Sequence, residues 1–206
     1  GVVHCDSNLN GIILEDGNTF VGIWRRCETD SLFTIPHRLV ATDWRDPSTY
    51  RPIIDEPLFV LGGSGAEDPS NIWTTTTSDM VTDDDEEESH TVALHVLLHD
   101  EQSTRCMLGQ CSANGRHAFS LDGGKSWRYA STDAYNRTIR FDNGTTLEVD
   151  TRARPHVVLD SKTNEIVAVT TGIQPDQDSG YVWTLAQGVQ KKGKHNNNNN
   201  NNELMT

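Results

Sequence analysis

Two adjacent carboxylates, Glu67 and Asp68, stand where the sequence is best suited to acid–base chemistry. They follow a glycine-rich stretch at residues 62–65 and precede Pro69 and the apolar segment 71–73. Neighbouring acids of this kind are commonly solvated turn residues, but the apolar segment brings at least one of them close to a packed sheet. A carboxyl group in that position can acquire a raised pKa and act in general acid–base or electrostatic catalysis.

Four histidines form a second candidate group. In segment 90–100, His95 and His99 are four residues apart, which places them on one face of a strand whose side chains alternate. His117 precedes a hairpin-like segment, and His156 opens another extended segment. We expect these side chains to converge on a binding pocket; the alternative is that each is a satisfied core or surface histidine. Their spacing follows no zinc-ligand rule, so no metal site is predicted.

The segment SLDGGKSW, residues 120–127, has the composition of an Asp-anchored hairpin turn. Asp122 can accept hydrogen bonds from the backbone amides of its own turn, as aspartate does in Asx turns. Gly123 and Gly124 permit positive φ angles, and Trp127 can pack over the hairpin as an apolar lid. These roles are structural, so Asp122 is a poor catalytic candidate.

Strand and hairpin patterns must position these residues. Apolar and β-branched runs alternate with Asp, Asn and Gly turn signals, and no long amphipathic helix is predicted. The sequence therefore predicts an all-β fold of about four antiparallel hairpin units, whose rhythm suits a β-propeller better than a sandwich. The expected extended segments and hairpins are residues 11–24, 37–44, 51–63, 71–77, 90–100, 138–149, 156–173 and 181–189.

Residues 1–189 are expected to form one β-propeller domain. From residue 190 the chain becomes a low-complexity, Asn-rich tail without core-forming side chains, so residues 190–206 are predicted to be disordered. The acidic run at residues 83–88 is interpreted as a solvated loop between strands rather than a calcium site.

The charge balance excludes two classes of partner. The chain carries 17 basic and 30 acidic side chains, a formal net charge of −13. Nucleic acid phosphates and anionic membrane surfaces both attract positively charged proteins, so neither is an expected partner. No apolar run reaches the length of a membrane span.

Cysteine spacing and glycosylation signals bear on the compartment. The four cysteines, Cys5, Cys27, Cys106 and Cys111, have no C-x-x-C spacing, which argues against a zinc ribbon or a redox motif. Cys106 and Cys111 flank a short stretch that a disulfide could close. Two N-glycosylation sequons, at Asn136 and Asn143, favour a secreted protein or the endomembrane lumen.

The motifs, taken in order, resemble those of five-bladed β-propeller glycoside hydrolases of the arabinanase/xylosidase (family 43) and invertase type. The resemblance extends over residues 8–189, and segment 120–127 is similar to the Asp-box of sialidase-like and other β-propellers. The motifs are NLNGIILEDGNTFVGIW, AEDPSNIW, HVLLHD, GRHAFSLDGGKSW, RARPHVVLD and VAVTTGI.

The resemblance implies a glycosidase that acts on, or binds, a neutral plant- or algal-type glycan and needs no cofactor. Asp68 matches the aspartate that stabilises charge in the sugar transition state, or acts as the acid. Trp73 stacks on a sugar ring or packs in the core. The implied pocket-lining residues are Glu67, His95, His117, Arg154 and His156.

Two departures leave alternatives open. Relatives of this type have a glutamate where this chain has Ala153, next to Arg154. The chain is also short for five blades, so the first blade, which carries the catalytic base, is expected to be missing; Asp6 is a replacement by position alone. A non-catalytic propeller that binds carbohydrate or protein is therefore the alternative. A sialidase is less favoured, because only Arg152 and Arg154 are placed for its arginine cluster.

Overall fold

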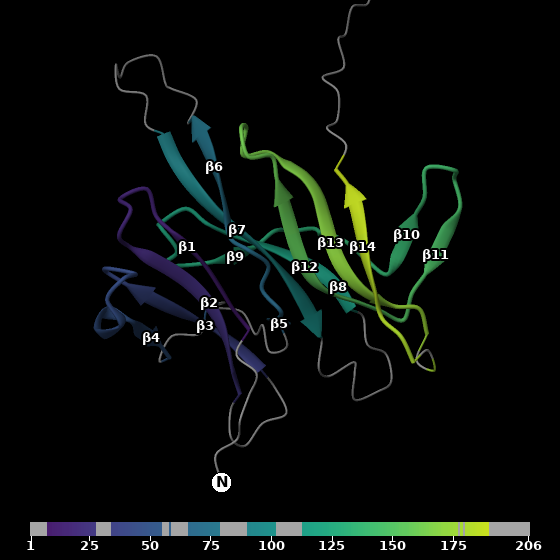
Figure 1. Ribbon diagram of the computed structural model, residues 1–206, viewed down its shortest axis with the longest axis horizontal. Helices are drawn as coiled ribbons and strands as arrows, with labels where there is room; N and C mark the ends of the chain where they lie inside the picture. Colours follow the sequence, from purple (N-terminus) through teal and green to yellow (C-terminus); the bar gives the residue numbers. More distant parts are fainter. Residues whose placement is uncertain are drawn as a thin grey trace, which may run out of the picture.

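The structure is a computed structural model of an all-β protein built from antiparallel sheets (Figure 1). No α-helix occurs among the residues that it describes; one 3₁₀ turn spans Pro47–Thr49. No helix in this part of the chain has the length and apolar character to cross a membrane. The described residues are 8–27, 34–54, 58, 66–78, 90–101, 113–176, 178 and 180–189.

The first sheet is a four-stranded meander. Asp16 sets its first turn by accepting hydrogen bonds from the amides of Asn18 (2.8 Å) and Thr19 (2.7 Å), while Gly17 adopts φ +71°. The hairpin expected at residues 11–24 is thereby confirmed. The strands pair in chain order: β1 (Leu9–Ile13), β2 (Phe20–Cys27), β3 (Thr34–Ala41) and β4 (Arg51–Ile53).

The second sheet contains an interrupted edge. Both β5 (Ala66–Glu67) and β6 (Trp73–Ser78) pair with the same side of the long strand β7, and the chain leaves the sheet between them. Segment 90–100, which was expected to be a strand, lies within β7. The sheet then continues as a meander through β7 (His90–Glu101), β8 (Ala113–Ser120) and β9 (Arg128–Tyr129).

The Asp-box turn between β8 and β9 has the predicted structure. Asp122 accepts hydrogen bonds from the Ser126 amide (2.9 Å) and hydroxyl (2.6 Å) and from the Ser120 hydroxyl (2.7 Å). Burial alone would raise the pKa of Asp122, but bonds from Ser126, Ser120 and a backbone amide lower it to about 2. Trp127 is 3% exposed and donates to the Gly124 carbonyl at 3.2 Å.

The third sheet and a separate hairpin complete the described fold. Segment 138–149 forms the expected hairpin, and segment 156–173 forms the first two strands of the third sheet. The strands are β10 (Thr138–Arg140) paired with β11 (Thr146–Glu148), and β12 (Thr151–Leu159), β13 (Ile166–Gln174) and β14 (Trp183–Gly188) in that order.

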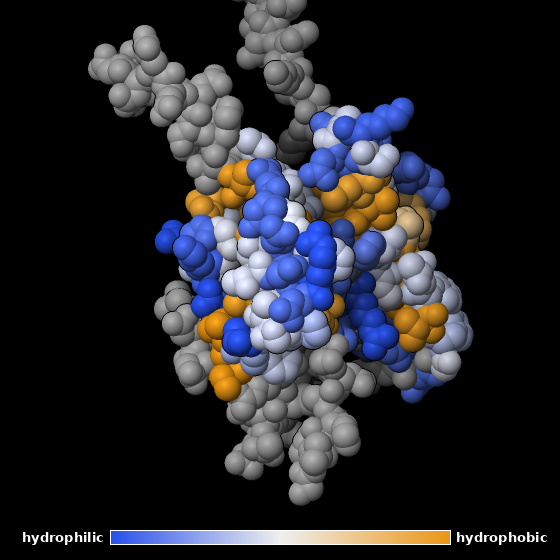
Figure 2. All heavy atoms as spheres, turned by 60° about the vertical axis from the view of Figure 1, so that its left-hand side comes forward, coloured by the Kyte–Doolittle hydropathy of each residue, from blue (hydrophilic) through white to orange (hydrophobic). Residues whose placement is uncertain are grey.

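The three sheets stack in chain order, with the second sheet in the middle (Figure 1). Adjacent residues of β7 face opposite neighbours: Leu98 packs with Ile23 of the first sheet, and Leu97 packs with Val157 of the third. A third cluster, which includes Ile139 and Ile173, joins the β10–β11 hairpin to the third sheet. On the flank in Figure 2, apolar surface occurs as separate patches between hydrophilic ones.

The all-β class and the antiparallel hairpins are thus confirmed, while the five-bladed ring stays a prediction. Several other expectations fall on parts of the chain outside the described residues. These are the solvated loop at 83–88, the tail at 190–206, the Cys106–Cys111 loop, and the position of Asp6.

Candidate functional site

The interruption between β5 and β6 holds Asp68 in an unusual backbone conformation. Its φ is +51°, and across from it Arg154 of β12 has φ +52°. Left-handed conformations of this kind cost about 1–3 kcal/mol each and persist only where the surrounding structure enforces them. The pairing of β12 with β13 shifts register between Ala153 and His156, so Arg154 lies in an irregular part of the strand. Strained residues on two sheets are therefore brought face to face.

The two side chains form an ion pair. Arg154 Nε lies 3.9 Å from Asp68 Oδ2, and the Asp68 side chain is 11% exposed whereas the Arg154 side chain is 83% exposed. The carboxylate is therefore sheltered while its guanidinium partner faces solvent. A carboxylate paired with a guanidinium is stabilised as the anion.

Two asparagines complete the cluster: Asn10 of β1 and Asn8, which directly precedes that strand. The Asn8 amide donates to Asp68 Oδ1, and the Asn10 amide donates to the Pro69 carbonyl. The cluster thus joins the first sheet, the β5–β6 interruption and the third sheet. Neither asparagine was predicted from the sequence, although their i, i+2 spacing places them on one face of an extended segment.

These residues surround an open, polar pocket of about 720 Å³, which we call the Asp68 pocket. Its walls offer amide and guanidinium donors and the Asp68 acceptor, groups that can bind sugar hydroxyls. Asp68 is the one carboxylate among the lining residues that the structure describes. The lining residues are Asn8, Leu9, Asn10, Asp68, Pro69, Arg154, Pro155 and His156.

Trp73, His95 and His117 form a separate aromatic stack. The ring of Trp73 lies 5.4 Å from His95 and 5.9 Å from His117, with interplanar angles of 20° and 16°. A chain of hydrogen bonds runs from Thr75 Oγ1 to His95 Nε2 (2.7 Å) and from His95 Nδ1 to His117 Nε2 (3.0 Å). A neutral imidazole has one donor nitrogen and one acceptor nitrogen, so one ring nitrogen of His95 donates in this chain and the other accepts.

Burial keeps this histidine pair neutral. Desolvation, with a further contribution from neighbouring His117, lowers the pKa of His95 to about 4, and desolvation also lowers the pKa of His117. At neutral pH neither imidazole carries a charge. The stack can pass or accept hydrogen bonds, but it is not a cationic site.

The predicted site residues therefore fall into two groups. Asp68, Arg154 and His156 share the Asp68 pocket. Trp73, 5% exposed, packs in the core together with Leu97 and Val157, so its ring is not displayed to the Asp68 pocket. His95 and His117 belong with Trp73 rather than with Asp68. The backbone of Glu67 pairs with that of His99 in the second sheet, and the Glu67 side chain is not among those that the structure describes.

No three His, Cys, Asp or Glu side chains are grouped as metal ligands in the part of the chain that the structure describes. The described site chemistry is therefore that of hydrogen-bond donors around one anchored carboxylate.

Comparison with known proteins adds no relative. The chain matches no protein-family model, no curated protein and no solved structure. The resemblance to β-propeller glycoside hydrolases accordingly rests on the sequence motifs alone, and the function has to be argued from the site.

Proposed function

We propose that the Asp68 pocket binds a neutral glycan and that this chain is a glycoside hydrolase-like β-propeller. The observation that carries the proposal is the ion pair of Asp68 and Arg154, which both have positive φ and come from the β5–β6 interruption and from β12. Backbone strain of this kind concentrates at functional sites, where the surrounding fold offsets its cost.

The chemistry of the pocket suits a sugar. A volume of about 720 Å³ is within the range of small-molecule sites, and the walls are more polar than those of a typical apolar ligand pocket. Arg154 and His156 are exposed and can donate to hydroxyl groups, while Asp68 can accept from one. A neutral glycan supplies both donors and acceptors and needs no compensating charge.

The stacked meanders support the propeller part of the proposal. Propeller blades are small antiparallel sheets that pack face to face in chain order around an axis. The three described sheets are antiparallel, and they stack in chain order through apolar cores. In a five-bladed arrangement they would be successive blades, with the Asp68 pocket where all three contribute residues.

Asp68 is better suited to stabilise positive charge than to donate a proton. A general acid must be protonated before the reaction, whereas Arg154 and Asn8 both stabilise the Asp68 anion. Glycoside hydrolysis passes through an oxocarbenium-like transition state, which a fixed carboxylate stabilises. Hydrolysis also requires a second carboxylate, about 5–5.5 Å away in a retaining enzyme or about 6.5–9.5 Å away in an inverting one. Glu67 remains the candidate for that role.

A non-catalytic glycan-binding propeller is the second candidate. Ala153 stands where the resemblance leads us to expect a glutamate, and Asp68 is the one carboxylate among the described lining residues. Such a protein would use the same pocket for recognition only.

Secretion forms part of the proposal. Both sequon asparagines, Asn136 and Asn143, are exposed at turns, where each accepts a backbone amide hydrogen bond at 3.0 Å. Either residue is therefore accessible to a glycosyltransferase in the secretory pathway.

The test measures turnover and binding on aryl glycosides and on arabinan and xylan oligomers, with wild type and three variants. Asp68→Asn removes the charge and keeps a residue that tolerates positive φ. Glu67→Gln tests the second carboxylate, and Asp142→Asn removes a charge from an exposed turn as the matched control.

Each result has a distinct meaning. Turnover that falls at least about 100-fold in Asp68→Asn, while Asp142→Asn is unaffected, supports the hydrolase. Calorimetric binding without turnover, lost in Asp68→Asn, supports the non-catalytic propeller. Binding that is identical in wild type and Asp68→Asn, or absent for every glycan, overturns the proposal.

A further inference from the structure

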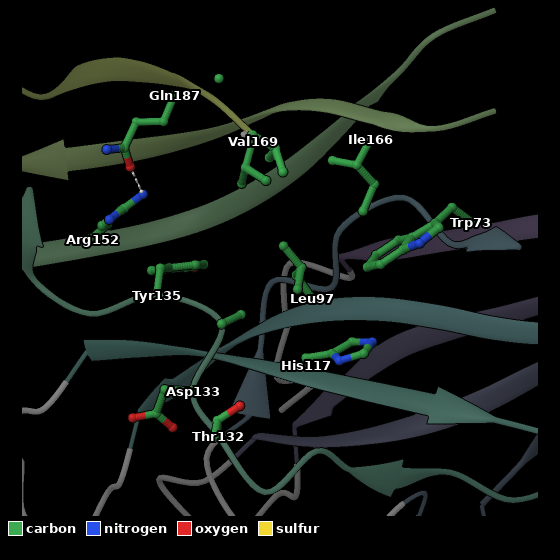
Figure 3. A pocket seen from close by; sticks show the side chains of 13 residues that line it. Trp73, Leu97, His117, Thr132, Asp133, Tyr135, Arg152, Ile166, Val169 and Gln187 are labelled. Carbon is green, nitrogen blue, oxygen red and sulfur yellow. Dashed lines mark hydrogen bonds between the residues drawn. The ribbon is translucent and has the colours of Figure 1, made fainter. Parts of the chain in front are cut away.

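A second cavity, of about 420 Å³, lies between the second and third sheets and shares no described lining residue with the Asp68 pocket (Figure 3). One end is mainly apolar, with Trp73, Leu97, Ile166 and Val169 on its walls and the imidazole of His117 beside them. At the other end Arg152 and Tyr135 lie next to each other. We call this cavity the Arg152 cavity.

Arg152 is a buried cation that forms no ion pair with an acidic side chain among the described residues, although burial and, to a lesser extent, the charge of Asp68 raise the pKa of the neighbouring Tyr135. Arg152 is 4% exposed, and its guanidinium lies over the Tyr135 ring, 4.5 Å from the ring centroid. It donates from Nε to Thr171 Oγ1 (3.1 Å), from Nη1 to the Asn136 carbonyl (3.2 Å) and from Nη2 to Gln187 Oε1. All of these acceptors are neutral. Burial accordingly lowers the pKa of Arg152.

The donors at this end of the cavity outnumber the acceptors. A guanidinium has five N–H groups, and three of those on Arg152 are engaged, which leaves one on Nη1 and one on Nη2. The Gln187 side-chain oxygen accepts a hydrogen bond from Arg152, and the Gln187 amide N–H groups are also available within the described structure. Among the described residues the Tyr135 hydroxyl also has no hydrogen-bond partner.

The acidic residue at the cavity rim does not cancel this imbalance. Asp133 is exposed, accepts a hydrogen bond from Asn114 (2.7 Å) and pairs with Arg116, whose Nε lies 3.7 Å from Asp133 Oδ1. Its charge is therefore balanced at the rim by Arg116.

We propose that the Arg152 cavity binds a small molecule with an apolar, ring-sized body and one carboxylate. The carboxylate pairs with Arg152 through its free Nη1 and Nη2 N–H groups, with the Gln187 amide beside them. The apolar body occupies the end formed by Trp73, Leu97 and Val169. A planar carboxylate matches the guanidinium fork better than any neutral group does. Its negative charge would also balance the positive charge of Arg152, which the neutral acceptors around it do not.

The test titrates 3-phenylpropanoate and its neutral isostere 3-phenylpropanamide into the protein by calorimetry. We expect wild type to bind the carboxylate at least about ten-fold more tightly than the amide, since hydrogen bonds between charged groups are the stronger ones. Arg152→Lys keeps the charge and removes the fork, so it should reduce that preference to less than about three-fold.

A second pair of variants keeps the test independent of the stability of Arg152 variants. Ala134 is exposed and lines the cavity, so Ala134→Trp fills it from the rim without altering the core. We expect this variant to lose binding of both probes. Ala186→Trp is the matched control, because Ala186 is exposed on β14 and does not line the cavity.

Three results would overturn the proposal. These are equal affinity for acid and amide in wild type, no saturable binding at millimolar probe, and unchanged binding in Ala134→Trp. None of them bears on the Asp68 pocket, whose test uses glycans and different variants.

Discussion

Arg154 combines an exposed side chain with a strained backbone conformation. Its side chain is 83% exposed and pairs with Asp68, while its backbone holds φ +52°. An exposed arginine stabilises a fold little, because surface ion pairs contribute about 0–1 kcal/mol. The small contribution of this ion pair therefore does not account for the backbone strain, which agrees with the proposed role of Arg154 in the Asp68 pocket.

Substitutions at this position test that interpretation. Arg154→Gly removes the side chain and relieves the left-handed strain, whereas Arg154→Ala removes the side chain alone. We expect the glycine variant to be more stable than the alanine variant by about 1 kcal/mol in urea denaturation. Both variants should lose glycan binding. Equal stability of the two would show that φ at this position is not strained in solution.

The His95–His117 pair predicts a specific pH dependence. The pKa of His95 is about 4 in the folded protein and 6.5 in the unfolded chain, so between these values the unfolded chain binds more protons. Folding stability should be full above pH 6.5 and fall as the pH is lowered toward 4. The pKa of Asp122 is lowered from 3.8 to about 2, so the stability that this carboxylate contributes is lost only as the pH falls below 3.8.

The direct measurement is a titration of the imidazole C–H resonances by NMR. The two rings are hydrogen-bonded, so they are expected to titrate as a coupled pair, below the ordinary imidazole pKa of 6.5. Titration of both rings near pH 6.5 would show that the stack is hydrated in solution.

At the scale of elements, the Asp-box turn connects two sheets as well as two strands. Gly123 and Gly124 both have positive φ, at +69° and +84°. A Cβ at Gly124 would lie 2.5 Å from Val21 Cγ1 of β2, while a Cβ at Gly123 would meet no atom within 4 Å. The turn of the second sheet therefore packs closely onto the first.

This difference gives a matched pair of variants. Gly123→Ala should cost about 1 kcal/mol, the penalty of a left-handed alanine. Gly124→Ala should cost about 1–3 kcal/mol more, because β2 must also move to relieve the overlap. Urea denaturation of both variants measures the difference. Equal losses would mean that the two sheets do not approach each other at this turn.

The hairpins were predictable because their signals are local. Asp16 and Gly17, or Asp122 and Gly124, determine a turn within a few residues, and the alternation of apolar side chains follows from the strand itself. The interruption between β5 and β6 has no such signal. It depends on Asn10, 59 residues away, which donates to the Pro69 carbonyl.

The composition of the site was predictable only in part for the same reason. Asp68 and Arg154 stand out by residue type, but their contact requires the first, second and third sheets to stack. The resemblance to glycoside hydrolases led us to expect His95 and His117 in one pocket with Asp68. Instead, the packing of the third sheet against the second places them beside Trp73 and Leu97.

At the scale of the whole molecule, the middle sheet holds the other two. Leu98 is 0% exposed and belongs to the core between the first and second sheets, while Leu97 belongs to the core between the second and third. The first sheet has no buried cluster of its own among the described residues, whereas the third sheet also packs on the β10–β11 hairpin through Ile139, Val149 and Ile173. The described sheets should therefore unfold together.

Leu98→Ala tests this cooperativity. Removal of a fully buried leucine should lower the free energy of unfolding by about 2–5 kcal/mol, because it combines a lost transfer free energy with a cavity. Leu121→Ala, at a leucine that is 55% exposed, is the control and should change it by less than about 0.5 kcal/mol. Tryptophan fluorescence and far-ultraviolet circular dichroism should report one coincident transition in each variant. Two separated transitions in Leu98→Ala would show instead that the first sheet folds independently. The Asp68 pocket would then open before the rest of the protein unfolds, because Asn8 and Asn10 at the start of that sheet form part of it.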